Sequence, residues 1–464
     1  MTEIIKKSLR DSAFARWIAL LLISATMFFA YMFVDVLAPI ANVLEIDFGW
    51  SPDAFGTVAG SEFILNVLGF LIIAGIILDR IGVRNSAVLA GSLMLIGSAI
   101  KFYGVSAYFS PESSLYQAFD GFSLFGLINP LPASAVMACI GFMIFGCGVE
   151  MSGITVSKAI VKWFKGKELA LAMGLEMSIA RLGVATVFIM SPKWAAAGGV
   201  SNSVGIGALL LCIGFLTFCC YYLMDLRLDR QEKTVETKED EFKFSDLKQI
   251  FTSKAFLITA GLCVLFYASI FPFQKFAVGM LDSRLVDPPM LPNQLFALFP
   301  IGAMILTPFL GFFLDFRGKG ATMLIGGALL MMICHTVFAL TPDAMFTFPI
   351  ALSAIILLGI SFSLVPASLW PSVPKLIDEK VLGSAYATIF WIQNIGLLFV
   401  PILIGNVLRA TNKGVDIAAG DTYNYTYVML IFASFGLLAL LLGIWLKAED
   451  KKKGYGLELP NKKR

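Results

Sequence analysis

The sequence predicts an all-α polytopic membrane protein with twelve transmembrane helices in two pseudo-symmetric bundles of six. Three observations lead to this prediction: an apolar composition, twelve apolar stretches of membrane-spanning length, and a charged run that divides those stretches six and six. Together they describe a chain that is surrounded mainly by lipid.

The composition is too apolar for a water-soluble protein of this length. Hydrophobic residues make up 58% of the 464 residues and charged residues 14%, whereas soluble domains average about 45–50% and about 25%. The mean hydropathy is +0.83. Since a soluble fold needs polar residues to cover its surface, this composition excludes an ordinary cytosolic enzyme, a disordered chain and a disulfide scaffold.

Twelve stretches are long enough to cross a bilayer, which takes about 20 residues of helix. Backbone groups in lipid must pair within their own segment, so each stretch is expected to be α-helical. The expected spans are residues 17–43, 53–78, 86–108, 134–163, 170–190, 204–225, 255–281, 293–314, 321–341, 347–370, 384–408 and 425–446.

The positive charges indicate how these spans are oriented. If the N-terminus is cytoplasmic, 27 of the 35 Lys and Arg residues fall on cytoplasmic segments or the adjoining helix ends. Cytoplasmic loops carry such an excess of positive charge. We therefore expect both termini in the cytoplasm, with the protein in the cell (inner) membrane of a bacterium or a lysosome-like membrane of a eukaryote.

The longest charged run, residues 227–254, falls between the sixth and seventh spans and is expected to be a partly helical cytoplasmic linker. It separates an N-terminal bundle at 1–226 from a C-terminal bundle at 255–447. Residues 448–464 follow as a basic cytoplasmic tail.

An internal repeat supports this division. Residues 75–82 and 311–318 both follow the pattern Gly-x-x-Leu-Asp-x-x-Gly, and each lies between the second and third spans of its half. A weaker match pairs residues 179–183 with residues 392–396. Twelve helices in two related halves are typical of a secondary transporter with a site at the membrane midplane between the repeats.

The first copy of the repeat resembles the loop signature of the major facilitator superfamily. The matching residues are Gly75, Asp79, Arg80, Gly82 and Arg84. Residues 163–183 resemble the branch of that superfamily whose animal members are lysosomal dipeptide transporters, as do residues 368–371 and 383–396. The resemblance implies the major facilitator fold, alternating access and dipeptides as substrates. It also allows an accessory subunit, as in the animal branch, while the chain itself is expected to be a monomer.

Ionisable residues within spans are candidates for function, because each costs ~2.5–3.5 kcal/mol on insertion scales and usually faces a cavity or a partner. At ~1.5 Å per residue, Glu150 lies roughly 24 Å along its helix and Arg181 roughly 16 Å along the next. Both therefore lie within the hydrocarbon. They either form a salt bridge that locks two helices or present two charges to a substrate, and the two interpretations are compatible.

A dipeptide suits such a pair of charges. A carboxylate recognises its ammonium group, and a guanidinium fork recognises its carboxylate. The resemblance further implies that Glu150 and Arg181 are the charged positions used by dipeptide-transporting members. Candidate walls of the surrounding cavity are Tyr31, Tyr267, Phe271, Trp370 and Trp391, although packing or lipid contact explains each of these aromatic residues equally well.

Further polar residues are candidates for substrate contact. Lys275 follows Pro272, which interrupts its helix, and it either contacts substrate, acts in a gate or extends to water at the outer end. Asn394, with Gln393 beside it, lies near the position that matches Arg181 in the repeat, and a ligand contact is expected there.

The remaining charged residues have different expected roles. Asp35 and Glu62 are either proton sites or structural hydrogen-bonding groups. Lys101 and His335 are expected to be structural, because their helices usually support the outside of each half in the superfamily that this sequence resembles.

The loop charges form a gating set. Asp79 and Arg84, and in the second half Asp315 and Arg317, are expected to form ion pairs and to cap helix ends where the halves meet in the outward-open state. The alternative is a tight turn with solvated charges.

The sequence also restricts the class of activity. Seven cysteines without metal-ligand spacing and a single histidine argue against a metal site, and no nucleotide-binding loop is present. We expect no cofactor, no nucleic-acid partner and no enzymatic activity. Besides a dipeptide carrier, a carrier of organic anions remains open, with Arg181 and Lys275 as the anion site and Glu150 as a proton-coupling group.

Overall fold

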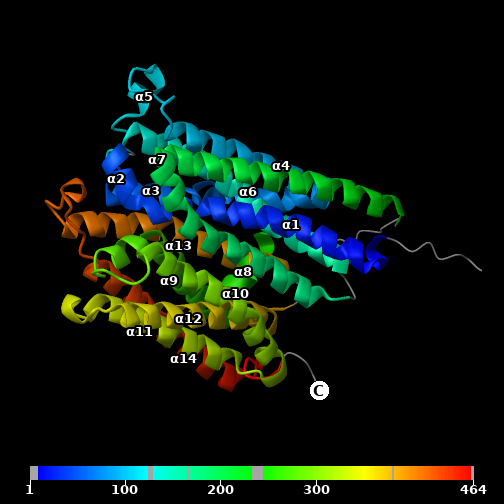
Figure 1. The fold of residues 1–464 in the computed structure, drawn as a ribbon. Helices are drawn as coiled ribbons and strands as arrows, with labels where there is room; N and C mark the ends of the chain where they lie inside the picture. Colours follow the sequence, from blue (N-terminus) through cyan, green and yellow to red (C-terminus); the bar gives the residue numbers. More distant parts are fainter. Residues whose placement is uncertain (1–8, 124–128, 165–166, 232–243, 379–380, 461–464) are drawn as a thin grey trace, which may run out of the picture.

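The computed structural model describes residues 9–123, 129–164, 167–231, 244–378 and 381–460, and this part of the chain is predominantly helical (Figure 1). The long helices are α1 (Ala13–Val34), α4 (Leu71–Gly104), α6 (Ala133–Phe164), α7 (Leu169–Gln231), α9 (Lys254–Asp282), α10 (Pro292–Arg317), α11 (Gly320–Leu340), α12 (Phe348–Leu376), α13 (Leu382–Thr411) and α14 (Thr426–Lys453). The shorter ones are α2 (Ala41–Phe48), α3 (Pro52–Ser61), α5 (Ser114–Phe119) and α8 (Phe244–Thr252).

Ten helical segments of the described chain are long and apolar enough to cross a membrane. Two of them, Pro52–Gly104 and Leu171–Gln231, have 53 and 61 residues, more than twice the ~20 that a bilayer takes. Their helical geometry is interrupted at Gly82 and at Gly198–Gly199. Each segment is therefore two spans, and the twelve predicted spans are confirmed.

We call the helices up to Gln231 the N half and those from Lys254 the C half. In Figure 1, α1–α7 lie on one side of the molecule and α9–α14 on the other. Helix α1 begins and helix α14 ends at the same end of the bundle, which we call the terminal end. The short helix α5 lies at the opposite end, which we call the far end. Of the predicted linker, α8 is helical and residues 232–243 lie outside the described residues. Residues 461–464 of the predicted tail also lie outside them.

The sequence repeat corresponds to a repeated backbone feature. Gly82 and Gly318, the last glycines of the two copies, have φ angles of 78° and 71°. Residues with side chains seldom adopt this left-handed region, whereas glycine enters it at little cost. The repeated glycine therefore allows the chain to turn at the same point in each half.

The two halves meet tightly at the far end, where α3 crosses α13. A Cβ atom on Gly56 would collide with the carbonyl of Pro401, and one on Gly405 would collide with the carbonyl of Pro52. Small residues let two backbones approach in this way in membranes. Beside the crossing, Arg409 of the C half forms an ion pair of 2.7 Å with Asp53 of the N half. The structure therefore has its far end closed.

The second span bends at a point that the sequence does not predict. After α3, residues Asn66–Phe70 form a short π-helix, and Gly69 within it has φ 112°. Such single-turn insertions in helices often occur at functional sites. The bend begins three residues after Phe63, which lines the cavity described below together with Glu62.

Candidate functional site

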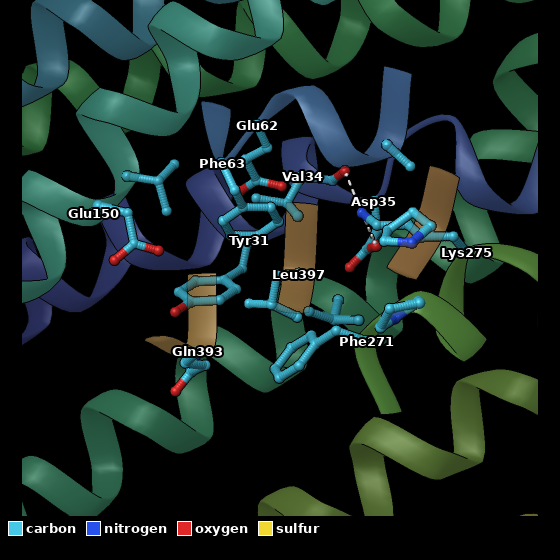
Figure 2. A pocket seen from close by; sticks show the side chains of 15 residues that line it. Tyr31, Val34, Asp35, Glu62, Phe63, Glu150, Phe271, Lys275, Gln393 and Leu397 are labelled. Atoms are coloured by element: carbon cyan, nitrogen blue, oxygen red, sulfur yellow. Dashed lines mark hydrogen bonds and ion pairs between the residues drawn. The ribbon is translucent and has the colours of Figure 1, made fainter. Parts of the chain in front are cut away.

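A cavity of about 90 Å³ lies between the two halves (Figure 2). Its walls come from α1, α3, α6 and α7 of the N half and from α9 and α13 of the C half. Of the residues predicted to bind substrate or to form the walls around it, five line this cavity: Tyr31, Glu150, Phe271, Lys275 and Gln393.

Glu150 offers its carboxylate to the cavity from α6. Figure 2 shows Glu150 at one end of the cavity and the Asp35–Lys275 pair at the other. Among the described residues, none forms a hydrogen bond or ion pair with the Glu150 carboxylate. A carboxylate without a protein partner, at the edge of a largely apolar cavity, is available to a cationic group of a ligand.

Arg181 lies among aromatic rings behind the cavity wall. Its guanidinium carbon is 5.8 Å from the ring centroid of Tyr31, 5.4 Å from that of Phe271 and 4.6 Å from that of Phe362. Tyr31 and Phe271 line the cavity, whereas Arg181 is not among its lining residues. Two of the three rings belong to the C half, so this arginine of α7 reaches across the interface between the halves.

The salt bridge considered for Glu150 and Arg181 is not formed between these two described residues. Guanidinium groups stack favourably on aromatic faces, and this accounts for a half-buried arginine that forms no salt bridge with a described residue. The other interpretation, in which both charges are left for a ligand, stays a prediction.

Lys275 is buried and paired rather than extended toward water. Its Nζ lies 2.8 Å from Oδ1 of Asp35 and 3.0 Å from the carbonyl oxygen of Val34. The Gln274 amide donates a hydrogen bond to the other Asp35 oxygen. Lys275 and Gln274 belong to α9 and Asp35 follows α1, so this cluster joins the halves and neutralises the lysine.

The polar residues of α13 point in different directions. Gln393 lines the cavity, and its Oε1 accepts a hydrogen bond from the Cys263 thiol at 3.5 Å. Asn394 donates to the carbonyl of Phe390 at 2.9 Å and does not line the cavity. Trp391 also lies outside the lining and donates to the carbonyl of Val67, in the other half, at 2.8 Å.

Tyr267 and Trp370 form a second aromatic layer. The Trp370 indole donates to the Tyr267 hydroxyl at 3.0 Å, and the Tyr267 ring stacks on Phe271 with centroids 5.6 Å apart. Neither residue is among those that line the cavity. The structure therefore places them behind Phe271, where they support the wall rather than form it.

The predicted gating residues lie outside the cavity. Oδ1 of Asp79 accepts a hydrogen bond from Lys158 at 2.6 Å, and Arg84 forms an ion pair with Asp229. Both pairs lie within the N half. Asp315 is half-buried and Arg317 is exposed. Their role in gating stays a prediction.

Two contacts of the site were missed at the level of sequence. Phe362 provides the ring closest to Arg181, but a phenylalanine in an apolar span carries no distinguishing signal. Gln274 is the amide that holds Asp35. Its position next to Lys275 in an otherwise apolar helix was a usable signal, because polar groups in spans usually have a partner.

Comparison with known proteins agrees with this architecture. A family model described as Major Facilitator Superfamily matches residues 23–401. The chain is 29% identical over 408 residues to the lysosomal dipeptide transporter MFSD1 of Danio rerio, a match that covers 85% of this chain and 78% of that protein. It is 27% identical over 411 residues to the protein of the same name from Mus musculus, with 86% and 78% covered.

A solved structure shares the fold. The crystal structure of a mutant of the nucleoside transporter NupG matches with a TM-score of 0.68 at 13% identity. The match covers 92% of this chain and 99% of that one. At this identity the likeness shows the arrangement of helices and leaves the substrate to be argued from the site.

Proposed function

Because the chain belongs to the major facilitator superfamily, and is therefore a multi-pass membrane transporter, we propose that it carries dipeptides by alternating access. Glu150 receives the ammonium group of the dipeptide, and Arg181 receives its carboxylate. The names of the relatives from fish and mouse support this substrate class.

One observation carries the proposal: beside one cavity lie an acid and a base, and neither forms a hydrogen bond or salt bridge with another described residue. Glu150 and Arg181 come from neighbouring helices of the N half, with the Tyr31 ring next to both the cavity and the guanidinium. A zwitterion satisfies both charges at once. Single-charged ligands leave one of them unpaired in a medium of low polarity, which is unfavourable.

The rest of the wall suits side chains of many kinds. Most lining residues other than the charged ones are apolar, among them Phe63, Val149, Val184, Phe271 and Leu397. Apolar walls fix no hydrogen-bond pattern and discriminate weakly between side chains. We therefore expect the protein to recognise the backbone of a dipeptide and to accept varied side chains.

The organic-anion alternative is less well supported. It needs Lys275 as a free cation, but the Lys275 ammonium already contacts the Asp35 carboxylate and the Val34 carbonyl. Gln274 holds the same Asp35 carboxylate in place. A dicarboxylate would then have Arg181 alone as a positively charged partner, beside a cavity that also holds the carboxylate of Glu150.

The orientation, domain bounds and membrane of the transporter are further parts of the proposal. We propose that both termini lie in the cytoplasm, that 1–226 and 255–447 form the two bundles, and that the protein works as a monomer. The names of these relatives favour a lysosomal membrane. Movement of substrate is facilitated or weakly proton-linked.

Thermal unfolding of the purified protein with a dipeptide library tests the substrate class. A bound ligand at 100 times its Kd adds about 2.7 kcal/mol of stability. Unmodified dipeptides are expected to raise the melting temperature, whereas N-acetylated or C-amidated ones, which lack one charge, are not. Stabilisation by dicarboxylates with none by dipeptides would contradict the proposal.

A further inference from the structure

A second buried lysine lies next to the ion pair that joins the halves. Lys101 on α4 is 1% exposed, and its Nζ lies 3.6 Å from the ring centroid of Phe142 and 5.1 Å from that of Phe33. No hydrogen bond or ion pair connects it to another described residue. An ammonium group buried with only aromatic partners is costly, and the substrate site does not account for it.

Lys101 and Lys275 share an aromatic ring. The Nζ of Lys275 is 5.9 Å from the Phe142 centroid, so the two ammonium nitrogens lie within about 9.5 Å of one another, the sum of the two distances. Asp35, the partner of Lys275, is two residues beyond Phe33, which contacts Lys101. One carboxylate therefore has a bound cation from the C half and a second cation nearby in the N half.

Packing ties Lys101 to the N half. A Cβ on Gly141 of α6 would collide with the Lys101 backbone, so α4 and α6 approach closely at this level. The Phe33 ring packs on Phe145, also of α6, with centroids 4.9 Å apart. Lys101, Phe142 and Asp35 therefore move together when the two halves rock against each other.

Opening of the far end would separate Lys275 from Asp35, whereas Lys101 stays with Asp35 in the N half. Lys275 and Gln274 lie on α9 of the C half and leave with it when the far end separates. Asp35 then loses both partners that hold it in this structure. Glu62 is a further acid of the N half at the same cavity, and its Oε2 is buried without a partner among the described residues.

We propose that Lys101 is the counter-ion that Asp35 takes when the far end opens, which makes it a positioning residue of the transport cycle. The long side chain of lysine can reorient around the Phe142 ring to reach the carboxylate. This inference rests on the proposed alternating access, but not on the identity of the substrate.

A crosslinking assay measures how often the far end is closed. Asn129 and Asn406 face each other across the halves, with Nδ2 and Oδ1 3.2 Å apart. In the Asn129→Cys/Asn406→Cys protein, purified without substrate, the rate of disulfide formation reports the closed population. Single-cysteine proteins control for pairing with the native cysteines.

Lys101→Met is expected to raise the closed population, because the open state would leave Asp35 without a counter-ion. We expect crosslinking to increase, because one unpaired buried charge shifts the ratio of closed to open protein by about tenfold. Lys101→Arg keeps the charge and should behave like the parent protein. Lys193→Met, at an exposed lysine of α7, is the matched control for loss of charge.

The double variant Asp35→Asn/Lys101→Met separates a counter-ion from a space-filling residue. With the carboxylate removed, loss of Lys101 should have no further effect, so the double variant should crosslink like Asp35→Asn alone. Lys101→Gln replaces Lys101→Met if the latter does not fold. Crosslinking of Lys101→Met at the parent rate, or additive effects of the two substitutions, would overturn the proposal. Since no substrate is used, failure of the dipeptide assignment leaves this result interpretable.

Discussion

The surroundings of Arg181 explain why this position holds an arginine rather than a lysine. Three rings lie within 5.8 Å of the guanidinium carbon. A planar guanidinium can stack on rings while its edge still binds a carboxylate through two parallel hydrogen bonds. A compact ammonium cannot do both.

Arg181→Lys is therefore not a conservative change. We expect it to weaken dipeptide binding at least about tenfold, in line with the loss of one bidentate charge-assisted contact. The melting temperature without ligand should change little, because the substitution retains the charge and most of the side chain. Titration calorimetry measures the binding, and Lys193→Arg is the control. Unchanged affinity would exclude Arg181 from the site.

Single residues also show what could be predicted from the sequence. Glu150 and Lys275 stand out as charges in apolar spans, and both line the cavity. The partner of Lys275 could not be deduced, because Asp35 lies 240 positions away and the pairing exists only once the halves meet. For Lys101, the expected supporting role gave no indication that it shares an aromatic ring with Lys275.

Among the helices, the crossing of α3 and α13 decides whether the far end can close. The crossing depends on Gly56 and Gly405, whose missing side chains leave room for the opposite backbone. Close approach of this kind gains stability from dispersion contacts and is lost when either residue acquires bulk.

Gly405→Leu tests the role of that crossing. Its side chain would meet the carbonyl of Pro52, and such overpacking costs about 1–3 kcal/mol. We expect crosslinking of Asn129→Cys/Asn406→Cys to fall, because the closed state alone carries the clash. Gly326→Leu on α11 is the matched control, since a Cβ there meets nothing within 4 Å. Equal crosslinking in both variants would show that the crossing does not control closure.

The number of spans followed from hydropathy, but their internal shape did not. The number of spans can be predicted from the length of the apolar stretches alone, because each stretch in lipid must form its own backbone hydrogen bonds as a helix. The π-helix at Asn66–Phe70 and the breaks in helical geometry at Gly82 and Gly198–Gly199 depend on local backbone geometry and on packing against neighbours. Apolar periodicity carries no information about either.

Taken together, the halves enclose a cavity below a closed far end. Two ion pairs, Asp35–Lys275 and Asp53–Arg409, join the halves there. Alternating access requires such contacts to be reversible. When a buried ion pair between the halves separates, each charge needs a new counter-ion or hydrogen-bond partner, because an unpaired buried charge is strongly unfavourable. Lys101 supplies one on the N half in the cycle proposed above.

The repeat predicted the twofold arrangement, and the cavity does lie between the halves. The residues that form its walls could not be predicted individually. Tyr267 and Trp370 are aromatic, as Tyr31 is, but they lie behind the residues that line the cavity. Distance from a cavity is set by helix rotation, which hydropathy does not determine.

Counterflow of a labelled dipeptide into proteoliposomes loaded with the unlabelled one, for the parent protein and for Glu150→Gln, decides whether the cavity works as proposed. Glu150→Gln keeps the shape of the side chain and removes the charge, and the exposed Glu112→Gln is its control. We predict transient accumulation by the parent and the control, and a rate at least about tenfold lower in Glu150→Gln with an unchanged melting temperature. Equal rates in the parent and Glu150→Gln, or no counterflow by the parent, would contradict the account.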